Sequence, residues 1–393
     1  MQRKRALRPL LAALTALVLL APASAGGQVF AGEVTQYVDP RQQTLLSYGD
    51  ESHWLQPWRA YLDTVPAVRF RDALGITFDV PDKHADAAAR LLAANGFKRA
   101  RFEVGFNNVQ YGAPSQLVNY NSLRTRLLAL KKYGIRPLIL LNSNQGAPAP
   151  NQVVALRTIE PAPRGATRIR LDAASAAAVV PRKTGLNNFQ TAGKMADPLI
   201  TAVDANGWAT LSRPLIRDLP AGSHQGSKLL YEPFHRPLRG DGTPEPRFEA
   251  TMAGWLNYVN VVTRDAKAIL GSQSFDIEVW NELGFASEFL DVDEYYAPNI
   301  DTGRGDVTDA IVRRTVAAVR NPASGVRAIG VTNGFASQRY DEAGSTSPPG
   351  LTAISKHPYL YGGVRRFPPA DVDGIRPLDA QGDSDGTQDA DGD

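Results

Sequence analysis

The amino-acid sequence predicts an α/β fold with a parallel sheet, interrupted by a β-rich insertion. Apolar runs typical of strands buried on both faces alternate with Ala- and Leu-rich helical segments, and this alternation breaks once, between residues 150 and 236. Strands that alternate with helices imply βα units wound in the same direction. About six such strands are expected, which suits either a doubly wound sheet or most of an eight-stranded barrel.

The first group of βα units is expected in residues 73–149. Glycines end both of its helices, and the irregular, aromatic-rich segment 26–72 before it is expected to wrap a domain surface. No glycine follows the first strand, so the phosphate-binding turn of a nucleotide-binding sheet is not predicted. The elements expected here are a strand at 74–80, a helix at 84–95, a strand at 99–104, a helix at 120–133 and a strand at 136–142.

The stretch 150–236 predicts a small antiparallel β domain. Short β-prone pieces separated by turn dipeptides lie in it, at 167–171, 199–203 and 208–211. Asn206-Gly207, between the last two pieces, is typical of a β-hairpin turn. A long disordered loop is the alternative, which the repeated strand and turn signals disfavour.

The βα alternation resumes in residues 237–370. A long helix at 248–270 carries apolar residues at the spacing of one buried helix face, namely Phe248, Met252, Trp255, Val259 and Val262. After it, the sequence predicts a strand at 275–280, a helix at 307–319, and strands at 326–332 and 351–357. An acidic segment rich in Asp and Gly follows at 371–393.

Residues 1–25 have the features of a cleavable secretory signal. A basic start precedes an apolar run from Pro9 to Pro22, and the segment ends in the small residues Ala23-Ser24-Ala25. The apolar run is short for a membrane span. We therefore expect cleavage after Ala25, a protein secreted to the extracellular space or cell envelope, and no membrane attachment after cleavage.

The charge of the chain and its lack of cysteine exclude several classes of protein. The 393 residues include 43 Lys and Arg against 40 Asp and Glu, a net charge of +3, but the signal segment holds four of the basic residues and no acidic one. The remainder therefore carries 39 basic against 40 acidic residues, a net charge of −1. Its Lys and Arg are scattered, so no nucleic-acid partner is expected. Without cysteine, disulfides, zinc–thiolate sites and a cysteine nucleophile are excluded.

Neither the histidines nor the acidic end predicts a bound metal. His84, His224 and His235 lack metal-ligand spacing, and the sequence has no Gly-x-Ser-x-Gly motif. The Asp-x-Asp-Gly pattern within 383–393 resembles extracellular calcium-binding repeats, but no bidentate glutamate stands at the twelfth position. We interpret this segment as solvated and acidic; a structural surface protein with a calcium-dependent tail is the weaker alternative. No metal and no organic cofactor are expected.

The most informative motif is Trp280-Asn281-Glu282, at the end of the apolar strand expected at 275–280. In a βα barrel the carboxyl ends of the strands form the active-site edge, so the polar side chains of this triplet would reach a site. A carboxyl group that is partly removed from water holds its proton more tightly, which suits a general acid. Glu282 is therefore the candidate catalytic residue. The alternative is that Glu282 only caps the helix that follows.

This motif resembles the superfamily of retaining β/α-barrel glycoside hydrolases, in which Asn-Glu closes the fourth strand, and it is most similar to the cellulase-like and β-xylosidase-like families. The resemblance implies a TIM (β/α)8-type barrel with Glu282 as the acid/base and Asn281 bonded to the sugar 2-hydroxyl. Trp280 would then offer its ring to a pyranose, and Arg101 would support a carboxylate nucleophile. The other substrate-binding positions that it implies are Asn142, Asn144, Asn333, His357 and Tyr359.

The sequence departs from this family pattern in one respect. Retention needs a second carboxylate as nucleophile, about 5–5.5 Å from the first, and the superfamily supplies a glutamate at the end of strand seven. Residues 362–393 contain no glutamate and no apolar strand. Earlier carboxylates stand in the loops after strands four and five, at Asp291, Asp293, Glu294 and Asp341. We therefore expect an incomplete barrel of about six strands, truncated before strand seven, in a fragment that lacks its nucleophile.

Together these features predict a secreted glycoside hydrolase that cleaves a poly- or oligosaccharide by a retaining two-carboxylate mechanism. The alternative is a non-catalytic carbohydrate-binding protein on a hydrolase-like barrel. Two site residues also have plainer alternatives, Arg101 as part of a surface ion pair and His357 as a structural histidine. The insertion is expected to overhang the active-site edge and to shape substrate access. The sugar, its linkage and the oligomeric state are not specified by the sequence.

Overall fold

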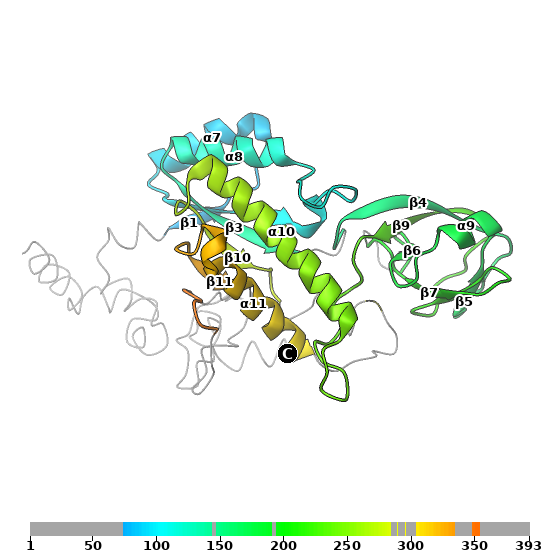
Figure 1. Ribbon diagram of the computed structural model, residues 1–393. Coiled ribbons are helices and arrows are strands. Elements are labelled where there is room, and N and C mark those ends of the chain that lie inside the picture. The colour runs from blue at the N-terminus through cyan, green and yellow to red at the C-terminus, as the bar shows by residue number, and fades with distance from the viewer. Residues whose placement is uncertain are drawn as a thin grey trace, which may run out of the picture. The chain divides into compact units, whose positions relative to one another are not determined.

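The computed structural model describes residues 74–143, 147–190, 194–283, 289, 295, 304–334 and 348–353. Figure 1 shows a parallel sheet accompanied by helices, and a β-rich insertion after strand β3. Outside the described residues lie the signal segment, the wrapping segment, the acidic end and three candidate site residues, Asn144, His357 and Tyr359. No helix among the described residues has the length and apolar character needed to cross a membrane.

Five parallel strands form the main sheet, and they follow one another in space in the order of the chain, β1-β2-β3-β10-β11. Their bounds are Gly75–Thr77 (β1), Arg99–Gly105 (β2), Arg136–Asn142 (β3), Asp276–Val279 (β10) and Val331–Asn333 (β11). Ala353 continues the series through a parallel bridge to Thr332, at the start of the strand expected at 351–357. A doubly wound sheet reverses its strand order at a switch point, and the described sheet has no such reversal.

The helices of these units also lie in the order of the chain (Figure 1), and their bounds are Ala85–Ala94 (α7), Tyr120–Lys132 (α8), Pro246–Leu270 (α10) and Arg304–Arg320 (α11). Each helix contacts the next one. Lys131 of α8 donates from Nζ to the carbonyl of Ile269 in α10 at 2.8 Å. Trp255 of α10 donates from Nε1 to Oγ1 of Thr315 in α11, also at 2.8 Å. The described βα units therefore follow one another along the sheet without the reversal that marks a doubly wound fold.

Alternation along β2 explains which face of the sheet the helices cover. Ala100, Phe102 and Val104 belong to the main hydrophobic core, which also contains the buried face of α10. Arg101 lies between them in sequence and is only partly buried, as expected for the opposite face. The apolar stripe predicted for the long helix is confirmed, because all of its members are fully buried: Phe248, Met252, Trp255, Val259 and Val262.

The limits of α10 follow from its own sequence. The side chain of Glu245 accepts a hydrogen bond from the N–H of Arg247 at 3.1 Å, and Pro246 occupies the first turn, where no N–H is needed. Gly271 follows the helix with a φ of 105°, which residues with a Cβ rarely adopt.

Between β3 and α10 the chain forms two antiparallel sheets of three strands each. One sheet contains β4 (Asn151–Thr158), β9 (Gly222–Leu229) and β6 (Thr184–Leu186). The other contains β5 (Arg168–Arg170), β8 (Trp208–Leu211) and β7 (Ile200–Val203), and the short helix α9 (Ala173–Ala178) follows β5. A hydrophobic cluster separate from the main core joins the two sheets and includes Leu156, Ile169 and Leu211.

The hairpin predicted at 199–211 is present, since β7 and β8 pair antiparallel. The Asp204 carboxylate accepts hydrogen bonds from the N–H of Asn206 at 2.9 Å and from the N–H of Trp208 at 3.0 Å. Gly207 has a φ of 81°, and a Cβ there would lie 2.6 Å from the carbonyl oxygen of Leu171. Glycine is therefore the residue that fits this turn.

The structure departs from the sequence-based expectation at β4 and β9, which were not expected as strands, and at β11, which starts later than expected. The polar, glycine-containing sequence of β9 does not predict a strand, and its pairing with β4 along eight residue pairs and with β6 fixes the extended backbone instead. The strand expected at 326–332 begins only at Val331. A 3-10 turn at Pro322–Ser324 and a left-handed Gly325, with a φ of 67°, delay its start.

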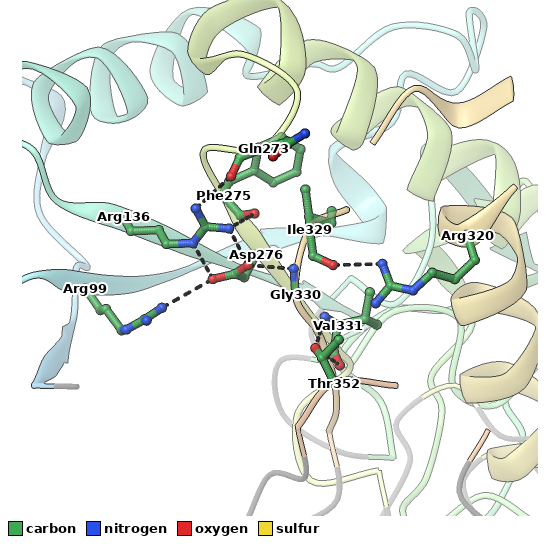
Figure 2. A network of polar contacts seen from close by, with 10 residues as sticks. All are labelled: Arg99, Arg136, Gln273, Phe275, Asp276, Arg320, Ile329, Gly330, Val331 and Thr352. Atoms are coloured by element: carbon green, nitrogen blue, oxygen red, sulfur yellow. Dashed lines mark hydrogen bonds and ion pairs between the residues drawn. The ribbon is translucent and has the colours of Figure 1, made fainter. Parts of the chain in front are cut away.

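An ionic cluster around Asp276 holds the amino ends of the strands together (Figure 2). Arg136 donates from Nε to Oδ2 and from NH2 to Oδ1 of Asp276, both at 2.6 Å, and the N–H of Gly330 donates to Oδ1 at 2.7 Å. Arg99 contacts Oδ2 at 3.4 Å. Burial opposes the ionisation of Asp276, but hydrogen bonds from Arg136 and Gly330 outweigh it and lower the pKa of this carboxyl. One carboxylate thus joins β2, β3, β10 and the residue before β11 at the amino-terminal edge of the parallel sheet.

Candidate active site

The carboxyl end of β10 has an unusual backbone. Trp280 and Glu282 have φ values of 72° and 53°, in the left-handed region that non-glycine residues seldom occupy. Such a conformation costs about 1–3 kcal/mol at each residue and persists only where the surroundings impose it. Here Trp280 N–H donates to the carbonyl of Leu141 at 2.5 Å, and Leu283 N–H donates to the carbonyl of Gly334 at 2.9 Å. The turn that carries Asn281 and Glu282 is therefore anchored to β3 on one side and to the end of β11 on the other.

Gly334 permits this arrangement because no side chain would fit at its position. A Cβ on Gly334 would lie 1.9 Å from the carbonyl oxygen of Trp280 and 2.2 Å from that of Val279. The end of β11 can therefore approach the turn after β10 only as glycine. A glycine directly after the strand is visible in the sequence Thr332-Asn333-Gly334. The reason that it must be glycine lies in the neighbouring strand β10 and cannot be read locally.

Arg101 connects β2 to the same turn. Its Nε donates to Oε2 of Glu278 at 2.5 Å, and its NH2 donates to Oδ1 of Asn281 at 2.8 Å. The Glu278 side chain is 3% exposed and the Arg101 side chain 27% exposed, so the pair is partly shielded from water. Because the amide oxygen of Asn281 accepts from Arg101, its amide nitrogen is left to act as a donor.

Asn142, the last residue of β3, supports the turn from the other side. Its Oδ1 accepts a hydrogen bond from the N–H of Asn281 at 3.3 Å. Its own N–H donates to the hydroxyl oxygen of Tyr258 at 3.2 Å, and that hydroxyl donates to the carbonyl of Val104. Burial raises the pKa of Tyr258 well above its ordinary value, which keeps the hydroxyl protonated as a donor. Arg101 and Asn142 therefore hold Asn281 from opposite sides.

Trp280 packs into the core instead of facing the site. It is fully buried, with its ring centroid 5.0 Å from that of Trp255 and 6.2 Å from that of Phe234. Strict alternation would place it on the face of Glu278, but the left-handed backbone turns its side chain toward α10. The ring therefore has no exposed face for a pyranose in this conformation. Its indole nitrogen has no hydrogen-bond partner among the described residues.

The structure brings most of the described candidates to one edge, but it exposes few of them. Asn142 is 7% exposed and Asn333, opposite Val279 in the sheet register, is fully buried. Both asparagines therefore lie inside the protein rather than at a surface open to sugar hydroxyls. Asn281 and Glu282 are only partly buried. A ligand at the described part of this edge would meet these two side chains and Arg101.

Sequence reasoning did not single out Glu278, Tyr258 and Gly334. A charged residue inside the apolar run of β10 is the signal that marks Glu278, because a carboxylate on a buried strand requires a partner. Tyr258 gives no such signal, since its position in α10 suits an ordinary core residue. Its role follows only from the register that places α10 beside the end of β3.

A second carboxylate for Glu282 is not fixed by the described residues. The acidic residues named for the loops after the fourth and fifth expected strands, Asp291, Asp293, Glu294 and Asp341, all lie outside them. Glu103 shares with Arg101 the face of β2 that turns away from the helices, and its side chain is exposed. Within the described ranges, no group of three or more His, Asp and Glu side chains is placed to hold a metal ion.

Comparison with known proteins gives likenesses among solved structures only. No protein-family model matches the sequence, and no curated protein matches it. Similar structures include a family 39 glycoside hydrolase from Bacteroides cellulosilyticus WH2, with 14% identity and a TM-score of 0.35 over 76% of this chain and 41% of that chain. A family 5 glycoside hydrolase from Prevotella bryantii B14 has 9% identity and a TM-score of 0.32, over 68% of this chain and 56% of that one.

A rutinosidase from Aspergillus niger is similar at 14% identity and a TM-score of 0.27, over 64% of this chain and 47% of that chain. A variant of the Prevotella enzyme is in complex with a xyloglucan tetradecasaccharide. The present chain spans 41–56% of the length of the family 39 hydrolase, the family 5 hydrolase and the rutinosidase. Likeness at this level assigns no role to any individual side chain. The candidate site is therefore argued only from the contacts described above.

Proposed function

We propose that this chain belongs to a glycoside hydrolase in which Glu282 is the acid/base. The observation that carries the proposal is the turn after β10, where Glu282 has a left-handed φ of 53° and directly follows Asn281. Two hydrogen bonds from opposite sides fix Asn281, from Arg101 at 2.8 Å and to Asn142 at 3.3 Å. Such strain is maintained at functional sites, where a side chain must be held in one orientation. The sequence resemblance of Trp280-Asn281-Glu282 to the hydrolase motif supports the same role.

The chemistry would use Glu282 twice. The partly buried carboxyl first gives its proton to the glycosidic oxygen, so that the leaving sugar departs as a neutral alcohol. The resulting carboxylate then accepts a proton from the water molecule that releases the bound sugar. The amide nitrogen of Asn281, kept as a donor by Arg101, would hold the sugar hydroxyl beside the reacting carbon.

Retention requires a second carboxylate as nucleophile. Glu282 is the one carboxylate that we assign, because the other acidic residues of the loops after β10 and β11 lie outside the described residues. A retaining reaction therefore predicts a further carboxylate near this edge, which trapping with a fluorinated glycoside and peptide mapping would identify. Trapping on Glu282 itself would contradict its role as the acid/base.

We propose a poly- or oligosaccharide as the substrate and export through the signal segment 1–25 as the route to it. The insertion supports an extended substrate, because β3 ends at Asn142 and β4 starts at Asn151, so the insertion leaves the sheet at the edge that carries Glu282. Removal of the insertion should lower activity on polymers more than on short glycosides. Equal activity on both after removal would contradict a role in access.

The experiment is a hydrolysis screen on a panel of polysaccharides and aryl glycosides, with the reading frame expressed to its stop codon. Glu282→Gln should strongly reduce hydrolysis of the polysaccharides, whose leaving groups need a proton, but keep binding in calorimetry. Glu160→Gln changes a glutamate of the insertion whose side chain is 40% exposed, and it serves as the matched control. Binding by wild type without any hydrolysis would favour the non-catalytic carbohydrate-binding protein.

A further inference from the structure

Lys194 is a buried lysine in the insertion, between β6 and β7, and it contacts Tyr295, which follows Glu282 in the chain. It is 1% exposed, and its Nζ lies 4.4 Å from the centroid of the Tyr295 ring, which is fully buried. A buried ammonium is costly unless the protein stabilises it. The negative face of an aromatic ring supplies such stabilisation, worth about 2 kcal/mol when both groups are shielded from water.

The chain presents Lys194 through a tightly folded piece of the insertion. Its carbonyl accepts from the N–H of Asn188 at 2.8 Å, and the N–H of Asp197 donates to the carbonyl of Leu186 at 2.7 Å. A Cβ on Gly185 would lie 2.3 Å from the carbonyl oxygen of Pro198, so this piece rests directly on β6. Nearby residues of the same piece, Ala196 and Leu199, belong to the main hydrophobic core, which contains residues of the parallel sheet and of α10, rather than to the core of the insertion.

A continuous series of contacts leads from Tyr295 to the candidate site. The ring of Tyr295 meets that of Phe289 edge-on, with centroids 6.3 Å apart. Phe289 accepts a hydrogen bond at its carbonyl from the N–H of Phe234 at 2.8 Å. Phe234 in turn packs on Trp280, with centroids 6.2 Å apart. Trp280 directly precedes Asn281 and Glu282 in the chain, so this series of contacts ends beside the candidate acid/base.

We propose that Lys194 is a positioning residue for catalysis: by holding Tyr295 it supports, through Phe289 and Phe234, the position of Trp280 beside Glu282, and it touches neither substrate nor the reacting atoms. The insertion would then contribute to the geometry of the acid/base as well as to substrate access. The catalytic part of this inference rests on the proposed function. The structural part, that the cation holds Tyr295 and, through it, Phe289, is testable without any substrate.

The test compares Lys194→Met, Lys194→Arg and a control, Lys228→Met, which removes a half-buried lysine from β9 of the same insertion. Hydrogen exchange of peptides that contain Phe289 and Tyr295 should be about 10- to 30-fold faster in Lys194→Met, because the ring loses its cation. Lys194→Arg keeps a cation over the ring and should exchange like wild type, as should Lys228→Met. On a hydrolysed glycoside, Lys194→Met should lower kcat about tenfold and leave KM within about twofold, since substrate contacts are intact.

Unchanged exchange in Lys194→Met, an equal effect of Lys194→Arg, or a change in KM without a change in kcat would each overturn the proposal. If Lys194→Met does not fold by circular dichroism, Tyr295→Leu replaces it. That variant removes the ring and should speed exchange at Phe289, and slow exchange there would equally overturn the proposal. If wild type hydrolyses nothing, the proposed function fails, whereas the exchange comparison still decides whether Lys194 holds this segment.

Discussion

Arg101 on β2 reaches past the intervening strand β3 to Asn281 at the end of β10, where its NH2 donates to Oδ1 at 2.8 Å. The same guanidinium donates from Nε to Glu278 at 2.5 Å. A planar, rigid fork that binds two groups fixes their relative orientation, which a flexible ammonium cannot do. Arg101 thus connects the turn that carries Glu282 to Glu278 in β10, the strand that precedes this turn.

Arg101→Lys should reduce hydrolysis without unfolding the protein. A lysine can keep one of the two contacts, and loss of a charge-assisted hydrogen bond to Asn281 should lower kcat/KM by about 10- to 100-fold. Steady-state kinetics measure the effect, with Arg99→Lys as control, because Arg99 lies at the amino end of β2 and its side chain is 49% exposed. Equal kinetics for both variants would show that the fork does not position Asn281.

Glu278→Ala should destabilise the fold. The change removes the carboxylate partner of a partly buried guanidinium, and we expect a loss of about 2–3 kcal/mol in the free energy of unfolding. Urea denaturation monitored by circular dichroism measures it. Glu103→Ala, at an exposed glutamate of β2, should cost less than about 0.5 kcal/mol. A loss at Glu278 no larger than at Glu103 would contradict the pairing.

Asp276 should make stability depend on acid pH. Its pKa is lowered below the ordinary value of 3.8 in the folded protein, so the unfolded chain binds this proton more readily. The stabilisation is therefore present above the unfolded value, and it is lost as the pH falls from about 5 through 3.8 to the folded pKa. Asp276→Asn should lower the unfolding free energy at pH 7 and flatten this part of the pH profile. An unchanged slope in the variant would assign the acid sensitivity elsewhere.

Gly334→Ala should disturb the turn after β10. The added Cβ would lie 1.9 Å from the carbonyl oxygen of Trp280, and the backbone must move to relieve that overlap. We expect a loss of about 3 kcal/mol in stability and weaker activity, measured by thermal unfolding and kinetics. Gly112→Ala is the control, because no atom lies within 4 Å of its added Cβ. Similar stability of the two variants would refute the close approach.

Much of the fold could be predicted because burial leaves a periodic trace. The continuous apolar run of 136–142 and the stripe from Phe248 to Val262 correspond to β3 and to the buried face of α10. The β-prone pieces on both sides of the turn dipeptide Asn206-Gly207 mark the hairpin in the same local way. The polar strand β9 leaves no such trace, because pairing with β4 and β6 makes it extended, and partners that are distant in sequence cannot be read from local composition.

The position of the candidate site could be predicted, but its internal geometry could not. A polar triplet after an apolar strand places Asn281 and Glu282 at the sheet edge. Alternation, however, assigns Trp280 to the open face, and a φ of 72° turns it into the core. That conformation depends on Leu141 and Gly334, which lie far from it in sequence. Arg101 was expected beside a carboxylate nucleophile, and its carboxylate partner in the structure is Glu278, on the same face of the sheet in β10.

The leaving-group dependence of hydrolysis tests the role of Glu282 most directly. A general acid matters when the departing alcohol is a poor leaving group, and much less when it is an activated phenol. We predict that Glu282→Gln lowers kcat/KM by about 10²–10⁴-fold on a sugar-linked substrate but by no more than about tenfold on a dinitrophenyl glycoside. Equal losses on both substrates, or no loss on either, would contradict the assignment of Glu282 as the acid/base.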